Sequence, residues 1–195
     1  MQEPNSIVQE IYKDEIVFTE EERTFIENRF EKVTFKKGEI ILVPEIEMNY
    51  QYYVSTGCLR TYLIEKSGKE HTIQFAIKDW WISDYIGYFL EGKSVLYIEC
   101  LEDAMMYKIQ RDDIEEIYVN IPKTERFTRK KLERSYATLQ KRILRNLSQS
   151  AKERYLSFTK EYPNIEQYVK NYHIASYLGI TTESLSRIRK DIAQN

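Results

Sequence analysis

The residues best suited to a chemical task lie together near the C-terminal end of the sequence. Between Thr181 and Lys190 the chain carries hydroxyl, carboxylate, guanidinium and ammonium groups within a single short stretch. Arg187 can donate two hydrogen bonds to a guanine edge, and Glu183 can accept one from a cytosine amino group or orient that arginine. Thr181, Thr182 and Lys190 suit phosphate oxygens near the ends of a helix. The full set that we expect to contact DNA is Thr181, Thr182, Glu183, Ser184, Ser186, Arg187 and Lys190.

These side chains belong to a pattern that predicts two short helices joined by a glycine turn. Ala175 is small, as a close helix crossing requires, and Gly179 falls where the first helix must stop, because glycine reaches the left-handed conformation at little cost. Thr181 can cap the second helix. The alternative is an ordinary amphipathic hairpin with a solvated polar face. The apolar positions at core spacing are Ile174, Leu178, Ile180, Leu185 and Ile188, with Ile192 one turn further on.

The formal charge changes sign along the chain. Residues 122–195 hold 16 Lys+Arg and 7 Asp+Glu, a net of +9, and residues 1–121 hold the remaining 13 and 24, a net of −11, which together give −2. Such a distribution indicates an acidic module joined to one that meets a polyanion, or else a solvated basic helix.

A long helix is predicted after Pro122. Its apolar residues fall at successive spacings of 4, 3, 4 and 4, and basic residues flank them. A narrow apolar seam on a charged helix seeks a partner helix, either in the same chain or in a second subunit, and we favour a two-fold dimer. The predicted dimer contacts are Leu132, Tyr136, Leu139 and Ile143, with Leu147 continuing the seam.

The N-terminal half must supply a scaffold, and its pattern predicts strands. Short segments rich in β-branched and aromatic residues alternate with glycine turns from Glu31 to Ile109. A capping box at Thr19 predicts a short helix from Glu20 to Phe30. We expect an α+β fold: an antiparallel, jelly-roll-like β-barrel over residues 1–121, a dimerisation helix over 122–147, and a winged helix-turn-helix domain over 148–195.

Other chemistries have little support in the sequence. It has no glycine-rich phosphate loop opening a helix and no Ser-His-Asp-like arrangement, so we expect no enzyme. His71 and His173 lack ligand-spaced partners, and Cys58 and Cys100 suit small buried side chains, so we expect neither a metal site nor a cofactor. Without a long apolar run or a hydrophobic leader, we expect no membrane contact and a cytoplasmic location.

The chain resembles the Crp–Fnr superfamily of transcription regulators across nearly its whole length, and the segment after Pro122 matches the dimerisation helix of that superfamily. Residues 36–41 (Lys-Lys-Gly-Glu-Ile-Ile) and 53–60 (Tyr-Val-Ser-Thr-Gly-Cys-Leu-Arg) look like two strand signatures of its cyclic-nucleotide-binding-like barrel. Residues 183–187 (Glu-Ser-Leu-Ser-Arg) resemble the Glu-x-x-Ser-Arg set with which Fnr-like members read their half-sites. The resemblance implies a homodimer on a pseudo-palindromic operator that contacts RNA polymerase when it activates transcription. The alternative function is a ligand sensor that acts through protein partners without binding DNA.

The effector region departs from the superfamily pattern. Members that bind cyclic nucleotides hold the phosphate with a Gly-Glu pair, a short helix, and an arginine followed by a small hydroxyl residue. Here Ser83-Asp84 replaces Gly-Glu and Ser94 stands near the arginine position, which argues against cyclic AMP, since Lys93 is only a point charge. The cysteine cluster of Fnr-type oxygen sensing is also absent from the sequence. The surrounding aromatic residues suit an apolar or planar ligand, or form a filled core, which we favour. The candidate pocket residues are Trp81, Ser83, Asp84, Tyr85, Lys93, Ser94 and Tyr97, and the effector itself is unidentified.

Overall fold

The computed structural model describes residues 6–13, 15–90 and 92–194. Within them the chain forms two compact units: one contains the described residues up to 61 and between 75 and 132, and the other contains residues 62–74 and the described residues from 133 on. The first unit holds most of the strands, and the second holds the C-terminal helices together with the tip of one β-hairpin. Each unit is described by itself below.

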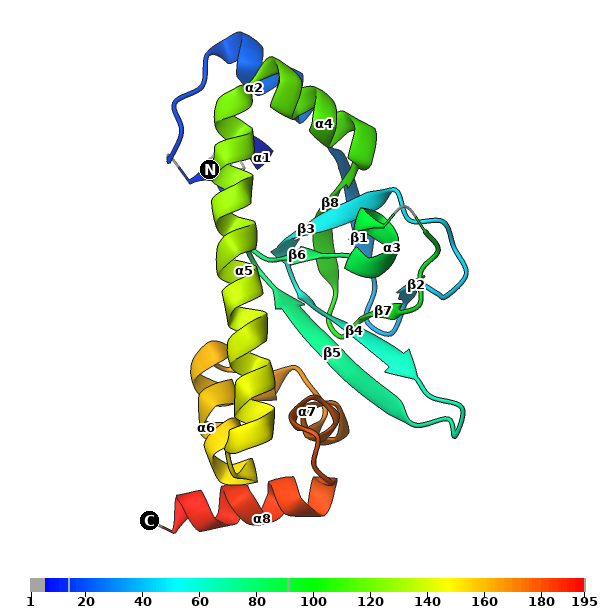
Figure 1. Ribbon diagram of the computed structural model, residues 1–195, viewed down its shortest axis with the longest axis vertical. Coiled ribbons are helices and arrows are strands. Elements are labelled where there is room, and N and C mark those ends of the chain that lie inside the picture. The colour runs from blue at the N-terminus through cyan, green and yellow to red at the C-terminus, as the bar shows by residue number, and fades with distance from the viewer. Residues whose placement is uncertain (1–5, 14, 91, 195) are drawn as a thin grey trace. The chain divides into compact units, whose positions relative to one another are not determined.

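The strands form two four-stranded sheets (Figure 1). One has the order β1-β8-β3-β6 and the other β2-β7-β4-β5. Strand β8 pairs antiparallel with β1 and β3, β6 pairs antiparallel with β3, and β7 pairs antiparallel with β2. Most neighbouring strands in these two sheets are far apart in sequence, so the strand arrangement is that of a jelly roll. The strands are β1 (Glu31–Phe35), β2 (Ile40–Leu42), β3 (Tyr50–Thr56), β4 (Cys58–Ile64), β5 (Glu70–Ile77), β6 (Trp81–Ile82), β7 (Tyr97–Cys100) and β8 (Ala104–Gln110).

The core of this unit lies on the inner faces of the sheets. Side chains from both sheets, among them Leu59, Ile82, Ile98 and Met106, are all 0% exposed in one cluster. The turn between β3 and β4 requires Gly57, because its φ is +98° and a Cβ there would lie 2.7 Å from the Ala104 backbone.

The same unit also contains α1 (Ile7–Tyr12), α2 (Glu20–Glu27), α3 (Tyr85–Phe89) and α4 (Arg111–Asn120). The predicted capping box of α2 is confirmed, since the Thr19 hydroxyl accepts from the Glu22 N–H at 3.2 Å and the Glu22 carboxylate accepts from the Thr19 N–H at 2.8 Å. The helix ends at Glu27, three residues before the predicted Phe30. Residues of α1, α2 and α4 form a second buried cluster with strand residues such as Tyr53 and Ile109.

The C-terminal half is helical. Helix α5 (Pro122–Ser148) is followed by α6 (Ala151–Glu161), a 3₁₀ turn η1 (Ile165–Gln167), α7 (Asn171–Leu178) and α8 (Thr182–Ala193). Helix α6 begins with a second capping box, in which Ser150 and Glu153 exchange hydrogen bonds. The predicted α+β class, with a β-rich N-terminal domain and a helical C-terminal domain, is confirmed. Residues 149–194, all described, contain no strand, so the wing of a winged motif is not formed in this part of the chain.

Of the helices that the structure describes, none combines the length and the hydropathy of a transmembrane segment.

Candidate functional site

The turn between α7 and α8 has the geometry that the sequence predicted. Gly179 takes the left-handed conformation at φ +66°, and its N–H points to the Ala175 and Ser176 carbonyls, the latter at 3.2 Å. The Ile180 N–H donates to the Ala175 carbonyl at 3.0 Å, which closes the end of α7. Thr181 then caps α8, because its hydroxyl accepts from the Ser184 N–H at 3.2 Å. Local hydrogen bonds therefore fix the direction in which α8 leaves the turn.

Helix α8 has one buried side and one open side. Leu185 is 0% exposed and Ile188 is 8% exposed, and helix α8 as a whole contacts α6 and α7. Ile192, which we predicted to point to the core, is only half-buried. Of the residues predicted to contact DNA, Thr182 and Ser184 are half-buried near the start of the helix. The others are exposed: Thr181, Glu183, Ser186, Arg187 and Lys190.

The Glu183 carboxylate is held at the start of α8. Its own backbone N–H and the hydroxyls of Thr181 and Thr182 lower the pKa of this carboxyl group, and the Thr182 hydroxyl lies 3.2 Å from Oε1. Glu183 is therefore an ionised acceptor at neutral pH. It lies one helical turn before Arg187, so both side chains belong to the same open side of α8.

Sequence reasoning missed the residue that ties α8 to its neighbours, Arg189. Its guanidinium donates to Glu166 Oε1 at 2.5 Å, to Asn171 Oδ1 at 2.6 Å and to the Tyr155 hydroxyl at 3.3 Å. The Tyr155 hydroxyl in turn donates to Glu166 Oε1 at 2.7 Å. These partners come from α6, the η1 turn and α7, so one side chain joins α8 to three elements. No local pattern reveals a pair such as Arg189 and Glu166, which are 23 residues apart.

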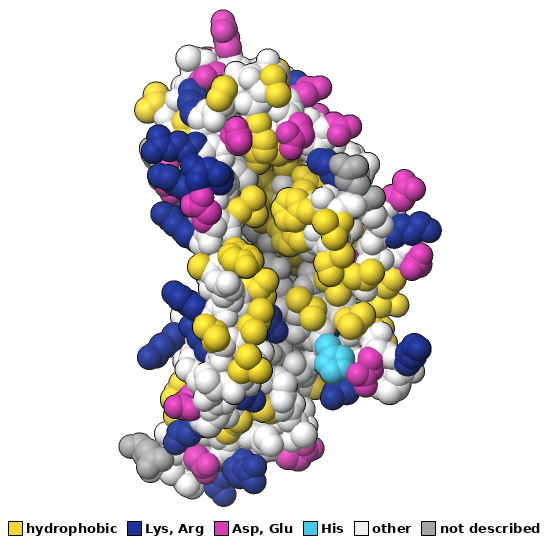
Figure 2. All heavy atoms as spheres, viewed as in Figure 1, with side chains coloured by type: hydrophobic (Ala, Val, Ile, Leu, Met, Phe, Trp, Pro, Cys, Tyr) yellow, Lys and Arg dark blue, Asp and Glu magenta, His cyan; other side chains and the backbone are white. Residues whose placement is uncertain are grey.

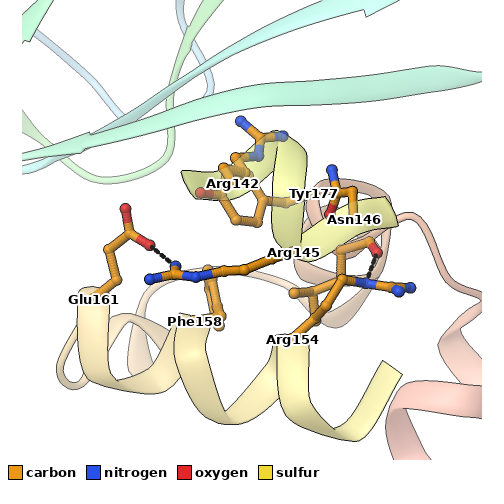
Figure 3. Close-up of a pocket in the computed structure, with 8 residues that line it drawn as sticks. Arg142, Arg145, Asn146, Arg154, Phe158, Glu161 and Tyr177 are labelled. Atoms are coloured by element: carbon orange, nitrogen blue, oxygen red, sulfur yellow. Dashed lines mark hydrogen bonds and ion pairs between the residues drawn. The ribbon is translucent and has the colours of Figure 1, made fainter. Parts of the chain in front are cut away.

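A second group of arginines holds α5, α6 and α7 together around a small cavity (Figure 3). Arg154 of α6 donates to the Leu178 carbonyl at 3.2 Å, which satisfies the last turn of α7. Arg145 of α5 pairs with Glu161 of α6 at 3.2 Å, and the Arg142 guanidinium lies 4.0 Å from the centre of the Tyr177 ring. These contacts position α7, against which α8 packs.

The predicted dimer contacts on α5 are exposed. Leu132 is 46% exposed, Tyr136 64%, Leu139 50% and Ile143 51%, and Leu147, at the end of the seam, is 80% exposed. Figure 2 shows hydrophobic side chains following one another along this helix, with basic residues beside them. A stripe of large apolar residues that continues over several turns indicates a surface that another molecule covers.

The candidate effector residues separate into two groups. Ser83, Asp84 and Ser94 are buried, at 2%, 0% and 0% exposure. Trp81, Tyr85 and Tyr97 are half-buried, and Tyr85 stacks on Phe89 with ring centres 5.3 Å apart. The Lys93 side chain is 59% exposed and lies 3.6 Å from Glu45.

One strand prediction is corrected in this region. Val95 and Leu96 lie in the region from Glu31 to Ile109 that we predicted to form short strands, but β7 begins only at Tyr97. The N–H groups of Val95 and Leu96 donate to the Asp84 carboxylate, at 2.6 and 3.0 Å, and so are not available to a neighbouring strand.

The histidines and cysteines lie in ordinary structural surroundings. His71 Nε2 is 2.9 Å from Glu65, and His173 is buried at 2% exposure. Burial raises the pKa of the Cys58 thiol to about 12 and that of Cys100 to about 11. Among the described residues no group of His, Cys, Asp and Glu could hold a metal ion.

Comparison with known proteins agrees with this architecture. Residues 32–120 match the cyclic nucleotide-binding domain family. The chain is 24% identical to the regulatory protein HlyX of Actinobacillus pleuropneumoniae, over 87% of this chain and 75% of that protein. It is 23% identical to the anaerobic regulatory protein of Haemophilus influenzae, over 87% and 70%.

Solved structures share the fold. FixK2 from Bradyrhizobium japonicum superposes with a TM-score of 0.73 at 19% identity, covering 85% of each chain. A crp/fnr-family regulator from Eubacterium rectale gives 0.67 at 20% identity, over 90% of this chain and 84% of the other. The match to the domain family and the shared fold therefore confirm the predicted resemblance to the Crp–Fnr superfamily. Proteins that this chain resembles are named as regulators.

Proposed function

We propose that this protein is a sequence-specific, DNA-binding transcription regulator that acts as a homodimer on a pseudo-palindromic site. The observation that carries the proposal is the division of α8 into a buried apolar side and an open polar side. Leu185 and Ile188 hold the helix on the protein, while Glu183, Ser186 and Arg187 remain exposed. A helix held on one side and polar on the other can enter a major groove without unfolding.

The side chains of the open face divide into two roles. Arg187 would donate to a guanine edge, and ionised Glu183 would accept from cytosine or align the arginine. Thr181 and Thr182 at the start of α8, and Lys190 in its last turns, would contact phosphates and set the register of the helix. Ser184 and Ser186 complete the proposed contact set. Arg189 acts indirectly, because it holds α8 in place.

The dimer rests on the exposed seam of α5. Large apolar residues repeat at near-heptad spacing from Leu132 to Leu147, and each is 46% exposed or more in the single chain. A second copy of the same helix would cover this seam in a two-fold arrangement. Two α8 helices related in this way would enter major grooves about 34 Å apart, one turn of DNA.

The remaining assignments follow from this proposal. Residues 1–121 would form the sensor domain, 122–147 the dimerisation helix and 148–195 the DNA-binding domain, within the cytoplasm. RNA polymerase would be a partner if the protein activates transcription. The similarity to proteins named as regulators supports the proposed role in transcription regulation.

Selection of bound sequences from a random duplex pool tests the proposal directly. The full chain should enrich a two-fold symmetric site, and its affinity should fall steeply with salt because phosphate contacts release counterions. Replacing Lys190 by alanine should weaken binding to all duplexes and reduce the salt slope by about 1. Lys130→Ala, which removes an exposed charge from α5, is the matched control and should leave the slope unchanged.

Equal binding of selected and random duplexes would contradict the proposal. So would an absence of binding by a chain that is folded and dimeric. In that case a regulator acting through protein partners would be the better account. Light scattering tests the dimer separately: Leu139→Glu should yield monomers, whereas Lys130→Glu, on the same helix, should not.

A further inference from the structure

A buried carboxylate lies within residues 32–120, the part of the chain that matches the cyclic nucleotide-binding domain family. Asp84 is 0% exposed and lies at the start of α3. Its Oδ1 atom accepts from the N–H groups of Ile86 and Gly87, at 3.0 and 3.4 Å. This half of the interaction is that of an ordinary N-cap.

The other oxygen of Asp84 reaches a separate segment of the chain. Oδ2 accepts from the Val95 N–H at 2.6 Å and the Leu96 N–H at 3.0 Å, and the Ser94 hydroxyl lies 3.0 Å away. Successive backbone N–H groups with a hydroxyl beside them form a binding concavity for an anion. An N-cap does not require these contacts, because Asp84 and Ser94 are ten residues apart.

Close packing also holds α3 against the segment that contains residues 94–96. Gly87 of α3 approaches so tightly that a Cβ there would lie 3.0 Å from the Lys93 carbonyl. The Gly92 N–H donates to the Gly87 carbonyl at 2.9 Å, and the Ser94 N–H donates to the Ile46 carbonyl at 2.7 Å. The donors around Asp84 are therefore held in position by the surrounding backbone.

Neutral donors, together with the fixed geometry, stabilise the buried charge. Lys93, the basic residue nearest to Ser94 in sequence, is 59% exposed and lies beside Glu45. Four backbone N–H groups and one hydroxyl surround the carboxylate. A phosphate needs the same type of donor, so a phosphate ligand would find these groups occupied and would meet a negative charge.

We propose that the Asp84 carboxylate is a built-in anionic ligand of this domain. It takes the hydrogen-bond donors that a phosphate would use, and it holds α3 and residues 94–96 in the closed arrangement without a bound cyclic nucleotide. The inference goes beyond the proposed function, because it concerns how the N-terminal domain is ordered and stands whether or not α8 binds DNA.

The unmodified full chain provides the first test. Thermal unfolding with cyclic AMP, cyclic GMP or inorganic phosphate at millimolar concentration should show a midpoint within about 1 °C of the ligand-free value, since a ligand that binds only the folded state must raise it. The amides of Val95 and Leu96 should exchange slowly with no ligand present. A rise of several degrees with a cyclic nucleotide, or fast exchange of both amides, would overturn the proposal.

The second test removes the built-in anion. Asp84→Ala should lower the unfolding midpoint by roughly 10 °C, because four N–H groups lose their partner in the interior. Formate or acetate should return several of those degrees at constant ionic strength, by occupying the vacated donors. Asp103→Ala is the matched control, because the Asp103 carboxylate is 61% exposed and binds Lys36 and the Lys37 N–H. Its loss should change the unfolding midpoint little, and formate or acetate should not raise the midpoint of this variant.

A folded Asp84→Ala chain that gains no more from formate than the parent would overturn the inference. If Asp84→Ala does not fold, Asp84→Asn gives the answer, since it keeps the shape but faces the donors with an amide. Its Val95 and Leu96 amides should exchange at least about tenfold faster than those of the parent. Exchange at the parent rate would show that the carboxylate is not the required ligand.

Discussion

Removing the Arg189 side chain tests whether one guanidinium holds α8 in place. Arg189 makes charged hydrogen bonds to Glu166 and neutral-acceptor bonds to Tyr155 and Asn171. Hydrogen bonds to charged groups contribute about 1.5–3 kcal/mol each when shielded from water. The side chains of Arg189 and Glu166 are 28% and 37% exposed, so solvent screening reduces that contribution. We therefore expect Arg189→Ala to destabilise the anchoring of α8 by about 2–3 kcal/mol in total.

Hydrogen exchange of the α8 amides measures this anchoring directly. Each 1.4 kcal/mol changes the opening equilibrium tenfold, so exchange should be about 30- to 140-fold faster in Arg189→Ala. Arg187→Ala is the matched control, because Arg187 is exposed on the same helix and its loss should change stability by less than about 0.5 kcal/mol.

The two arginines should therefore give opposite patterns. Arg187→Ala should cost roughly 1–3 kcal/mol in affinity for the selected duplex and relax discrimination at one base position, with normal exchange of α8. Arg189→Ala should weaken binding to every duplex, because the helix itself is no longer held. If the α8 amides of Arg189→Ala exchange as slowly as those of the parent, the anchoring role is refuted.

Three further predictions concern stability and reactivity. Leu185→Ala should lower the free energy of unfolding in urea by about 2–5 kcal/mol, because the Leu185 side chain is 0% exposed. Leu144→Ala, at a residue that is 63% exposed, should change that free energy little, and equal effects of the two substitutions would contradict the assigned faces of α5 and α8. The hydrogen bond from Lys123 lowers the pKa of Glu22 below its ordinary value of 4.5, so the Glu22 carboxylate stabilises the fold above pH 4.5 and this stabilisation is lost as the pH falls through the lowered pKa. The stability of Glu22→Gln should therefore depend less on pH below 4.5, and an unchanged pH profile would argue against the Lys123–Glu22 pair. Cys58 and Cys100 should resist iodoacetamide at pH 8 in the native chain and react once it is unfolded, as followed by intact mass, because burial raises both pKa values; rapid native labelling would show that the thiols are accessible.

Much of the candidate interface was predictable because its determinants are local. The left-handed Gly179, the Thr181 cap and the alternation of buried and exposed residues on α8 depend on neighbours within a few positions. The same holds for the capping boxes at Thr19 and Ser150. The strands between Glu31 and Ile109 were recognisable by composition, but the pairing of β1 with β8 depends on residues far apart in sequence.

Two interactions could be found only in the folded molecule. Arg189 has no local feature that distinguishes it from Lys190, and only the packing of α6, η1 and α7 brings Glu166, Tyr155 and Asn171 to its guanidinium. Asp84 could be identified as an unusual residue in the effector region, but its sequence position does not specify which donors it meets. In the folded chain α3 lies against residues 94–96, and the buried Asp84 carboxylate accepts hydrogen bonds from donors in that segment. The sequence by itself thus determined most of the elements and the main faces of the helices, since these follow from local backbone chemistry, but not the ends of α2 and β7. Only the tertiary structure decided which side chains anchor α8 and which donors meet the Asp84 carboxylate, since both depend on contacts between distant segments.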